Sequence, residues 1–416
     1  MPFKSFLIVL ILFALLLGSP EHSAAQDQAP VNSYTIQPGD TWTALAYHFQ
    51  TPIGTLQEIN GWTNRQRQPA IGATLTVPVG AATHETGRLT RGTGGLLQHA
   101  VGLNGNPWSI AIRAEMTHPY RPVLGRPLFQ LGGTEPPRDW PAGMAALEVS
   151  HVPAVPGQAL ALRGTLLEPA EVKVQLDAHN WVAANNGRRF VAIGGTGAFL
   201  APGDHELLLV PDNGPAWTQP WRFSPGSWTF QEITLTGSAA QIDQESIRRE
   251  RERLEGIWSR VNLEPFWRDA FTRPIDSFLA VSSDYGARRS YNGGPYRTYH
   301  EGVDFSAYGG TPVFAPAGGR VALAETLYVR GGAVIIDHGL GVFSGYYHLS
   351  EVTARLGQEV VPGEIIGHVG TSGLSTGNHL HWDMLVGGLW IDGAAWLDAD
   401  LACWIRAGWG EPCLDD

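Results

Sequence analysis

Two histidines stand two residues apart in the short stretch 378–384, one on either side of Leu380. On a β-strand, residues i and i+2 point to the same face, so His379 and His381 face one side while Leu380 faces the other. The stretch therefore predicts a strand that carries a polar site on one face and packs into a sheet through the other. We therefore expect the C-terminal part of the chain to be a β-sheet domain.

The turn-forming residues indicate a mainly β architecture for the rest of the chain as well. Glycine (51) and proline (29) make up 80 of the 416 residues, and charged residues only 16%, against about 25% in an average globular chain. Such a composition favours short strands joined by turns over long helices. The formal net charge of −11 argues against nucleic acid as a partner, because nucleic acid requires a basic surface.

The two ends of the chain predict an exported protein. Residues 1–25 have the pattern of a signal peptide, with Lys4 before an apolar run at 6–17 and small residues at 23–25. About 12 apolar residues cannot span a bilayer, which needs roughly 20. We expect an extracytoplasmic monomer, secreted or associated with the cell wall, with no stable membrane anchor after cleavage. Cys403 and Cys413, the two cysteines, predict a disulfide in a C-terminal tail, 398–416. The alternative is a metal-binding pair, which the lack of a nearby histidine in the sequence makes less favourable.

An N-terminal module is predicted over residues 33–78. Residues 33–36 look like a strand, Leu45 and Phe49 share a helical face, a second short helix follows, and 75–78 form a returning strand. The segments 34–41 and 71–78 resemble those of a LysM module. The resemblance implies a small βααβ fold that binds glycans containing N-acetylglucosamine, such as peptidoglycan. The alternative is a βααβ domain that no longer binds sugar.

The middle of the chain contains no recognisable chemistry. Apolar stretches such as 108–112 and 172–176, separated by Gly, Pro and Asn, predict one or two β-sandwich domains of immunoglobulin-like type over 87–237. Residues 241–262 predict an amphipathic linker helix, because Arg and Glu alternate while apolar residues fall on one face. We interpret it as a solvated linker, the alternative being a binding element. The middle domains could also cover the C-terminal site as an inhibitory segment.

The spacing of polar residues in the C-terminal segment is typical of a metal site. His300 and Asp304 lie four residues apart, and the histidine pair His379/His381 follows. A catalytic zinc ion takes three protein ligands and keeps one position open for water. His300, Asp304 and one member of the pair could supply those ligands. The other member, or His348, could then act on the water as a base.

The same residues carry a second resemblance, to the lysostaphin/LytM family of zinc endopeptidases. The motifs that carry it are, in chain order, 283–289, 300–305, 310–313, 319–321, 334–339, 347–349 and 370–382. The resemblance implies an antiparallel β-sheet domain over 271–397 and one Zn²⁺ ion bound by His300, Asp304 and His381. It also implies two catalytic histidines, His348 and His379. Asn378 and Trp382 depart from the usual Pro and Phe, but neither is a ligand position.

The two resemblances together imply an exported zinc metalloendopeptidase. It would hydrolyse peptide bonds in peptidoglycan stems or cross-bridges while the LysM module holds the glycan. The alternative is a non-catalytic peptidoglycan-binding protein or amidase activator, since some family members have lost ligands or catalytic histidines. All five of these positions are occupied here, which favours the enzyme.

Overall fold

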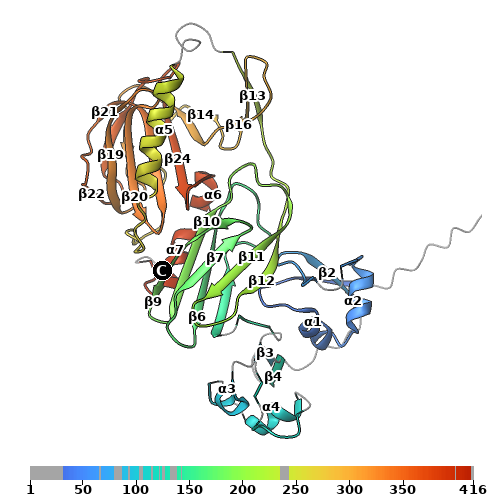
Figure 1. Cartoon of the computed structure of the whole chain (residues 1–416). Helices are drawn as coiled ribbons and strands as arrows, with labels where there is room; N and C mark the ends of the chain where they lie inside the picture. Colours follow the sequence, from blue (N-terminus) through green and yellow to red (C-terminus); the bar gives the residue numbers. More distant parts are fainter. Residues whose placement is uncertain are drawn as a thin grey trace, which may run out of the picture.

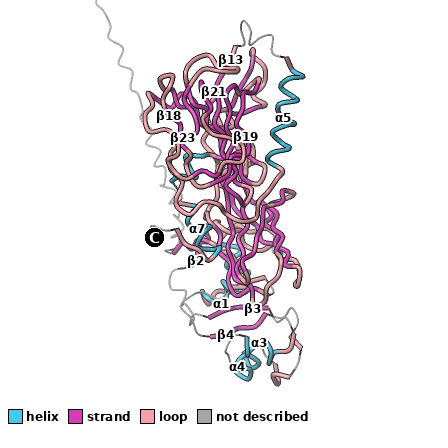
Figure 2. The backbone as a smooth tube through the Cα atoms, turned by 90° about the vertical axis from the view of Figure 1, so that its left-hand side faces the viewer, coloured by secondary structure: helices cyan, strands magenta, loops and turns pink. Residues whose placement is uncertain are grey.

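The computed structural model shows an elongated, mainly β protein (Figures 1 and 2). It describes residues 31–64, 67–78, 87–91, 94–102, 106–113, 116–120, 122–123, 127–131, 138–141, 143–234, 243–398 and 400–413. The predicted signal peptide lies outside these residues. Within them, no helix is long and apolar enough to cross a membrane.

The N-terminal module has the βααβ order predicted from the sequence. Its strands β1 (Val31–Thr35) and β2 (Thr74–Pro78) pair antiparallel, and helices α1 (Trp42–His48) and α2 (Ile53–Ile59) lie between them in the chain. A small core forms because apolar side chains from both helices and from β2 meet behind the sheet. We call residues 31–78 the first module.

Residues 87–131 differ from the predicted strands. They form β3 (Gly87–Arg91), α3 (Leu96–Gly102), α4 (Pro107–Arg113) and β4 (Pro127–Leu131), with β3 and β4 paired antiparallel. The stretch 108–112, expected to be a strand, is part of α4. Pro107 explains the difference, because the fixed φ of proline suits the first turn of a helix. We call residues 87–131 the second module.

A β-sandwich follows the second module. One sheet has the strand order β5-β6-β10-β9 and the other β12-β11-β7-β8, and the two share one apolar core. The strands are β5 (Met144–Val149), β6 (Ala159–Leu166), β7 (Val172–Leu176), β8 (His179–Asn180), β9 (Val182–Asn186), β10 (Arg189–Gly195), β11 (Gly203–Pro211) and β12 (Trp217–Phe223).

The first module is attached to the edge strand β12 of the sandwich. Ile71 pairs with Trp221 as in a parallel sheet, and the buried Gln219 inserts between the loops of the module. The backbone N–H of Gly39 donates to Gln219 Oε1 (3.0 Å), while Gln219 Nε2 donates to the carbonyls of Asp40 (3.3 Å) and Pro69 (3.2 Å). Because these polar groups are buried and paired, the contact holds the module in one orientation.

The C-terminal domain is built on a large antiparallel sheet, as predicted. Its strand order is β14-β17-β24-β21-β20-β19-β22, with β18, β23 and β25 joined to it. A smaller sheet, β13-β15-β16, lies beside it. The strands are β13 (Phe230–Ile233), β14 (Ala280–Ser283), β15 (Arg288–Tyr291), β16 (Thr298–Tyr299), β17 (Gly302–Ser306), β18 (Pro312–Phe314), β19 (Gly319–Leu327), β20 (Gly331–Gly339), β21 (Val342–Val352), β22 (Glu359–Val360), β23 (Ile365–Val369), β24 (His379–Val386) and β25 (Leu389–Ile391).

Helix α5 (Gln244–Trp258) occupies part of the predicted linker, but it is not only a solvated linker. Asp243 caps it by accepting a hydrogen bond from the N–H of Glu245. Leu254 and Trp258 are buried against the sheet of the C-terminal domain, as is the carboxylate of Glu250. The Arg/Glu run therefore has one buried face.

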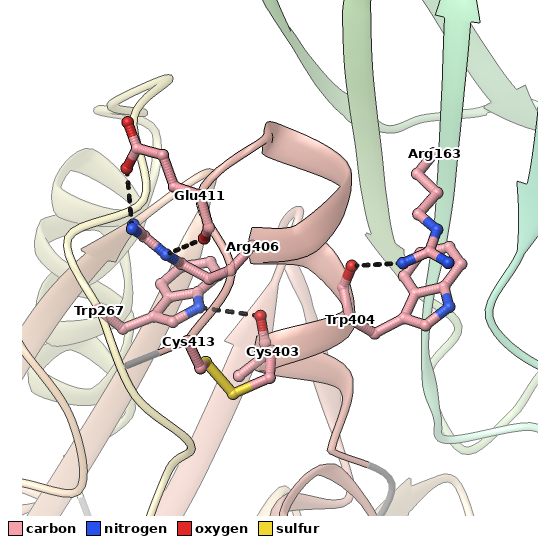
Figure 3. The surroundings of a disulfide bond; sticks show 8 residues. Arg163, Trp267, Cys403, Trp404, Arg406, Glu411 and Cys413 are labelled. Carbon is pink, nitrogen blue, oxygen red and sulfur yellow. Dashed lines mark hydrogen bonds and ion pairs between the residues drawn. A yellow bond between two sulfur atoms is a disulfide. The ribbon is translucent and has the colours of Figure 1, made fainter. Parts of the chain in front are cut away.

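The end of the chain joins the C-terminal domain to the sandwich. Helices α6 (Gly393–Asp398) and α7 (Leu401–Trp409) lie between the two, and the predicted disulfide Cys403–Cys413 closes the tail (Figure 3). Arg163 of β6 stacks on Trp404 and donates to its carbonyl oxygen (3.2 Å). At Gly195 of β10 a Cβ atom would come 2.8 Å from a carbonyl oxygen of β24, so the two domains touch closely.

Candidate metal centre

Strand pairing brings three of the predicted site residues together. Asp304 of β17 lies directly opposite His381 of the neighbouring strand β24. His300 precedes β17 and is almost completely buried. One ligand atom from each of the three residues lies within 4.8 Å of the other two. The register of two adjacent strands thus assembles the group from distant parts of the sequence.

The side chains of this group point their nitrogen and oxygen atoms at a common point. His381 Nδ1 lies 2.8 Å from Asp304 Oδ1 and 3.0 Å from His300 Nε2. His300 Nε2 is 3.1 Å from the same carboxylate oxygen. The other ring nitrogen of His300, Nδ1, contacts the carbonyl of Asp284 (3.0 Å), which accepts its proton. Nε2 of His300 is then the nitrogen with the lone pair, as a metal ligand requires.

The charge states of Asp304 and His381 also suit a metal ion. Burial alone would raise the pKa of Asp304, but the imidazoles of His300 and His381 beside it outweigh burial and hold this pKa well below its usual range. Burial lowers the pKa of His381 to about 3. Asp304 is therefore ionised and His381 neutral at neutral pH. Two imidazoles and one carboxylate are a common donor set for zinc, so the residues present fit such an ion.

His348 and His379, expected to be the catalytic pair, lie beside this group. Their ring centroids are 4.7 Å apart. His348 Nδ1 donates to the carbonyl of Ser372 (2.8 Å), and His379 Nδ1 donates to that of Gly377 (2.9 Å). His379 Nε2 lies 3.9 Å from Asp304 Oδ1. Each Nδ1 is occupied by a backbone carbonyl, which leaves Nε2 of each ring as the proton acceptor.

The backbone of His348 is held in an unusual conformation. Its φ is +63°, in the left-handed region that residues other than glycine rarely adopt. The N–H of His348 donates to the carbonyl of Arg330 (2.8 Å). The conformation thus depends on the position of the turn between β19 and β20, which contains Arg330.

A buried charge network, not foreseen from the sequence, supports this turn. Glu250 of α5 accepts from the Arg330 guanidinium (3.0 Å) and from the N–H of Val329 (2.7 Å). Arg330 also stacks over Tyr347, the residue before His348, and lies 3.8 Å from Glu301, the residue after His300. The network thus connects helix α5 to both sides of the candidate metal centre. Glu250 is one of several glutamates that alternate with arginines in this helix, so the sequence does not distinguish it as the residue that binds Arg330.

A second unforeseen carboxylate lies behind His381. Asp383, two residues along β24, is buried with its Oδ2 3.9 Å from His381 Nε2. Burial raises the pKa of Asp383 to about 7. The i, i+2 spacing that pairs His379 with His381 also puts Asp383 on this face, so strand periodicity could have identified it.

Comparisons with known families agree with this geometry. Residues 298–393 match Peptidase family M23, and residues 34–78 match the LysM domain. The chain therefore carries an M23 peptidase domain and a LysM domain. The M23 match contains all three residues of the candidate metal centre and both neighbouring histidines.

Individual relatives match the chain over little more than 100 residues. Peptidoglycan DD-endopeptidase ShyA of Vibrio cholerae is 37% identical over 120 residues, 29% of this chain and 28% of the relative. DD-carboxypeptidase/endopeptidase Mpg of Neisseria meningitidis is 39% identical over 111 residues, 27% of this chain and 25% of the relative. The chain thus spans about a quarter of the length of these relatives. A solved structure from Pseudomonas aeruginosa assigned to peptidase M23 is 26% identical, with a TM-score of 0.46, over 60% of this chain and 96% of that one.

Proposed function

We propose that the protein is an extracytoplasmic zinc metalloendopeptidase that cleaves peptide bonds in peptidoglycan stems or cross-bridges. The observation that carries the proposal is the convergence of His300, Asp304 and His381 within 4.8 Å of one another. Beside them lie His348 and His379, whose Nδ1 atoms donate to backbone carbonyls and whose Nε2 atoms can accept a proton. The relatives of the M23 domain are named as peptidoglycan DD-endopeptidases, which supports the substrate class.

His300, Asp304 and His381 would hold one zinc ion. Bound there, zinc would polarise the scissile carbonyl and lower the pKa of a bound water towards about 7. Burial lowers the pKa of His348, so this imidazole is neutral at neutral pH and its Nε2 can accept a proton from water. His379 lies 4.7 Å away between ring centroids. Once its Nε2 has taken up a proton, it can donate that proton to the carbonyl oxygen or to the leaving amine.

The LysM domain would retain the enzyme on its substrate. We propose that it binds the glycan strand, which raises the local concentration of stem peptides around the M23 domain without any new contact at the site. Peptidoglycan would then be the partner of both domains, as glycan at one and as peptide at the other.

Substitutions can distinguish the residues that bind zinc from the proposed catalytic histidines. We expect His300→Ala and His381→Ala to lose both bound zinc and hydrolysis of purified peptidoglycan, because each removes a ligand from a three-residue set. His348→Ala should keep stoichiometric zinc and still lose hydrolysis. Zinc is measured by elemental analysis and the released muropeptides by mass spectrometry.

Full hydrolysis by either ligand variant would reject the proposed centre. A wild-type protein that binds peptidoglycan, contains no zinc and releases no fragments would instead support a non-catalytic role in the wall, such as amidase activation.

A further inference from the structure

The second module repeats the architecture of the first. In both, strands of five residues enclose two helices of seven residues, and the first strand pairs antiparallel with the last. Four residues separate the helices in each (49–52 and 103–106). The final strand follows after 14 residues in the first module (60–73) and 13 in the second (114–126). The connection from the first strand to the first helix has six residues in the first module (36–41) and four in the second (92–95). The element order, the four element lengths and the connection between the helices therefore agree, while the other two connections differ by one and two residues.

Sequence positions repeat in the same register. A glycine stands two residues before the final strand in both modules, as Gly72 and Gly125. The second residue of that strand is a buried leucine in both, Leu75 and Leu128. In the second helix the fourth and fifth residues are buried in each case, 56–57 in α2 and 110–111 in α4. Leu56 and Leu75 belong to the apolar core of the first module, and Ile110, Ala111 and Leu128 belong to that of the second, so the two modules share a packing pattern.

The sequence of the turn between the first strand and the first helix is not repeated in the second module. In the first, Asp40 accepts from the N–H of Gln37 (2.7 Å) and from the hydroxyl of Tyr34 (2.8 Å), which fixes the turn between strand and helix. In the second, the corresponding stretch, 91–95, is glycine-rich and has no acidic residue.

Exposed aromatic rings cluster on the second module. Trp108 of α4 is 49% exposed and Tyr120 is 69% exposed, and their rings meet edge to face with centroids 6.4 Å apart. His118 lies beside Tyr120, whose N–H donates to its Nδ1 (3.2 Å). Large aromatic side chains normally bury most of their surface. An exposed aromatic surface with polar atoms at its edge suits a sugar, whose C–H faces pack on rings while its hydroxyls form hydrogen bonds.

The second module is also placed where a polymer can reach it. Both views show it at the end of the molecule, beyond the first module and far from helix α5 (Figures 1 and 2). The first module, by contrast, uses two of its loops to contact the sandwich through Gln219.

We infer that residues 87–131 are a second glycan-binding module, which takes a polymer of N-acetylated hexosamines through the surface formed by Trp108 and Tyr120. The inference rests on the glycan-binding role proposed for the LysM domain and adds a second site to it. Two sites on one chain bind a polymer more tightly than either alone, by a factor of 10² to 10⁴ where the spacing allows both to be occupied.

The test compares full-length proteins by calorimetry and by sedimentation with insoluble peptidoglycan. The calorimetric probe is a soluble hexamer of N-acetylglucosamine, and a chelator is present throughout so that no substrate is cut. We expect two sites per wild-type chain and one in Trp108→Ala/Tyr120→Ala, with apparent affinity for peptidoglycan reduced at least about tenfold. Trp108→Phe/Tyr120→Phe should restore binding, because the aromatic surface returns.

Phe230→Ala/Tyr296→Ala is the matched control. These two rings form another exposed edge-to-face pair, 5.1 Å between centroids, in the C-terminal part of the chain. The Phe230→Ala/Tyr296→Ala variant should bind the hexamer and peptidoglycan as the wild type does. One site in both the wild type and the Trp108/Tyr120 variant would overturn the inference and leave the LysM proposal intact. Absence of any site in the wild type would overturn both. Hydrolysis of a soluble muropeptide, measured separately with zinc, reports on the M23 domain alone.

Discussion

Helix α5 should control the activity of the M23 domain although it lies outside the matched residues. Glu250 is buried, and its two carboxylate oxygens bind Val329 and Arg330. The carbonyl of Arg330 in turn holds the N–H of His348. Removal of the Glu250 carboxylate therefore disturbs His348 through two successive contacts.

The size of the effect follows from these contacts. Breaking a buried ion pair by removing one partner costs about 3–5 kcal/mol. Glu301 remains 3.8 Å from Arg330 and offsets part of that loss, so we expect Glu250→Ala to lower the free energy of unfolding by about 3 kcal/mol. Glu250→Gln keeps an acceptor for the Val329 N–H and should lower the free energy of unfolding by about 1–2 kcal/mol.

The effect on kcat follows from the backbone of His348. Its left-handed conformation costs about 1–3 kcal/mol to maintain. If this residue relaxes, kcat should fall roughly 10- to 100-fold.

The assay measures kcat and KM on a soluble muropeptide together with bound zinc and urea-induced unfolding. Glu250→Ala should have a lower kcat than the wild type, retain its zinc and show little change in KM. Arg253→Ala is the control on the same helix, because its ion pair with Glu325 is exposed and is worth at most about 1 kcal/mol. Wild-type kcat in Glu250→Ala, measured where the variant is fully folded, would refute the reasoning. So would a loss of kcat in Arg253→Ala of the same size.

Two further predictions concern stability. Reduction of the Cys403–Cys413 disulfide, or Cys403→Ser/Cys413→Ser, should lower the free energy of unfolding by roughly 3 kcal/mol, from the chain entropy of closing a loop of sequence separation 10; identical urea midpoints for the oxidised and reduced protein would contradict this. Burial lowers the pKa of His338 to about 4, against about 6.5 in the unfolded chain. Between these pH values the unfolded chain binds a proton that the native state does not, so the unfolding free energy should fall as the pH falls, by up to about 3 kcal/mol. His338→Asn should show a shallower decrease over that window in urea titrations at each pH, and an unchanged slope would exclude His338 as its source.

The candidate metal centre was largely predictable because its chemistry follows strand periodicity. The two-residue spacing of His379 and His381 places both on one face, and the structure confirms that they lie on one strand, β24. The sequence could not reveal that Asp304 stands opposite His381, because register depends on pairing between distant strands. The resemblance to a known family supplied that information.

Two features were beyond sequence reasoning for different physical reasons. The stretch 108–112 is a short apolar run, which suits a buried strand and a buried helix equally well. Pro107 at the first helical position favours the helix, and packing of Ile110 and Ala111 in the second module stabilises it as α4. Glu250 lies among alternating charges that predict a solvated helix, yet α5 turns this one carboxylate inward to Arg330. A partner 80 residues away gives no local signal.

The contact between Gln219 and the first module has a consequence for the products expected from the proposed peptidase. That module is fixed to the sandwich, and the sandwich is fixed to the M23 domain through α7 and the close approach at Gly195. If the first module holds the glycan, the peptide bond that is cut lies at a constant distance from the bound sugar. Stem peptides repeat along a glycan strand at regular intervals, so an enzyme of this build should cut in a periodic pattern rather than at random.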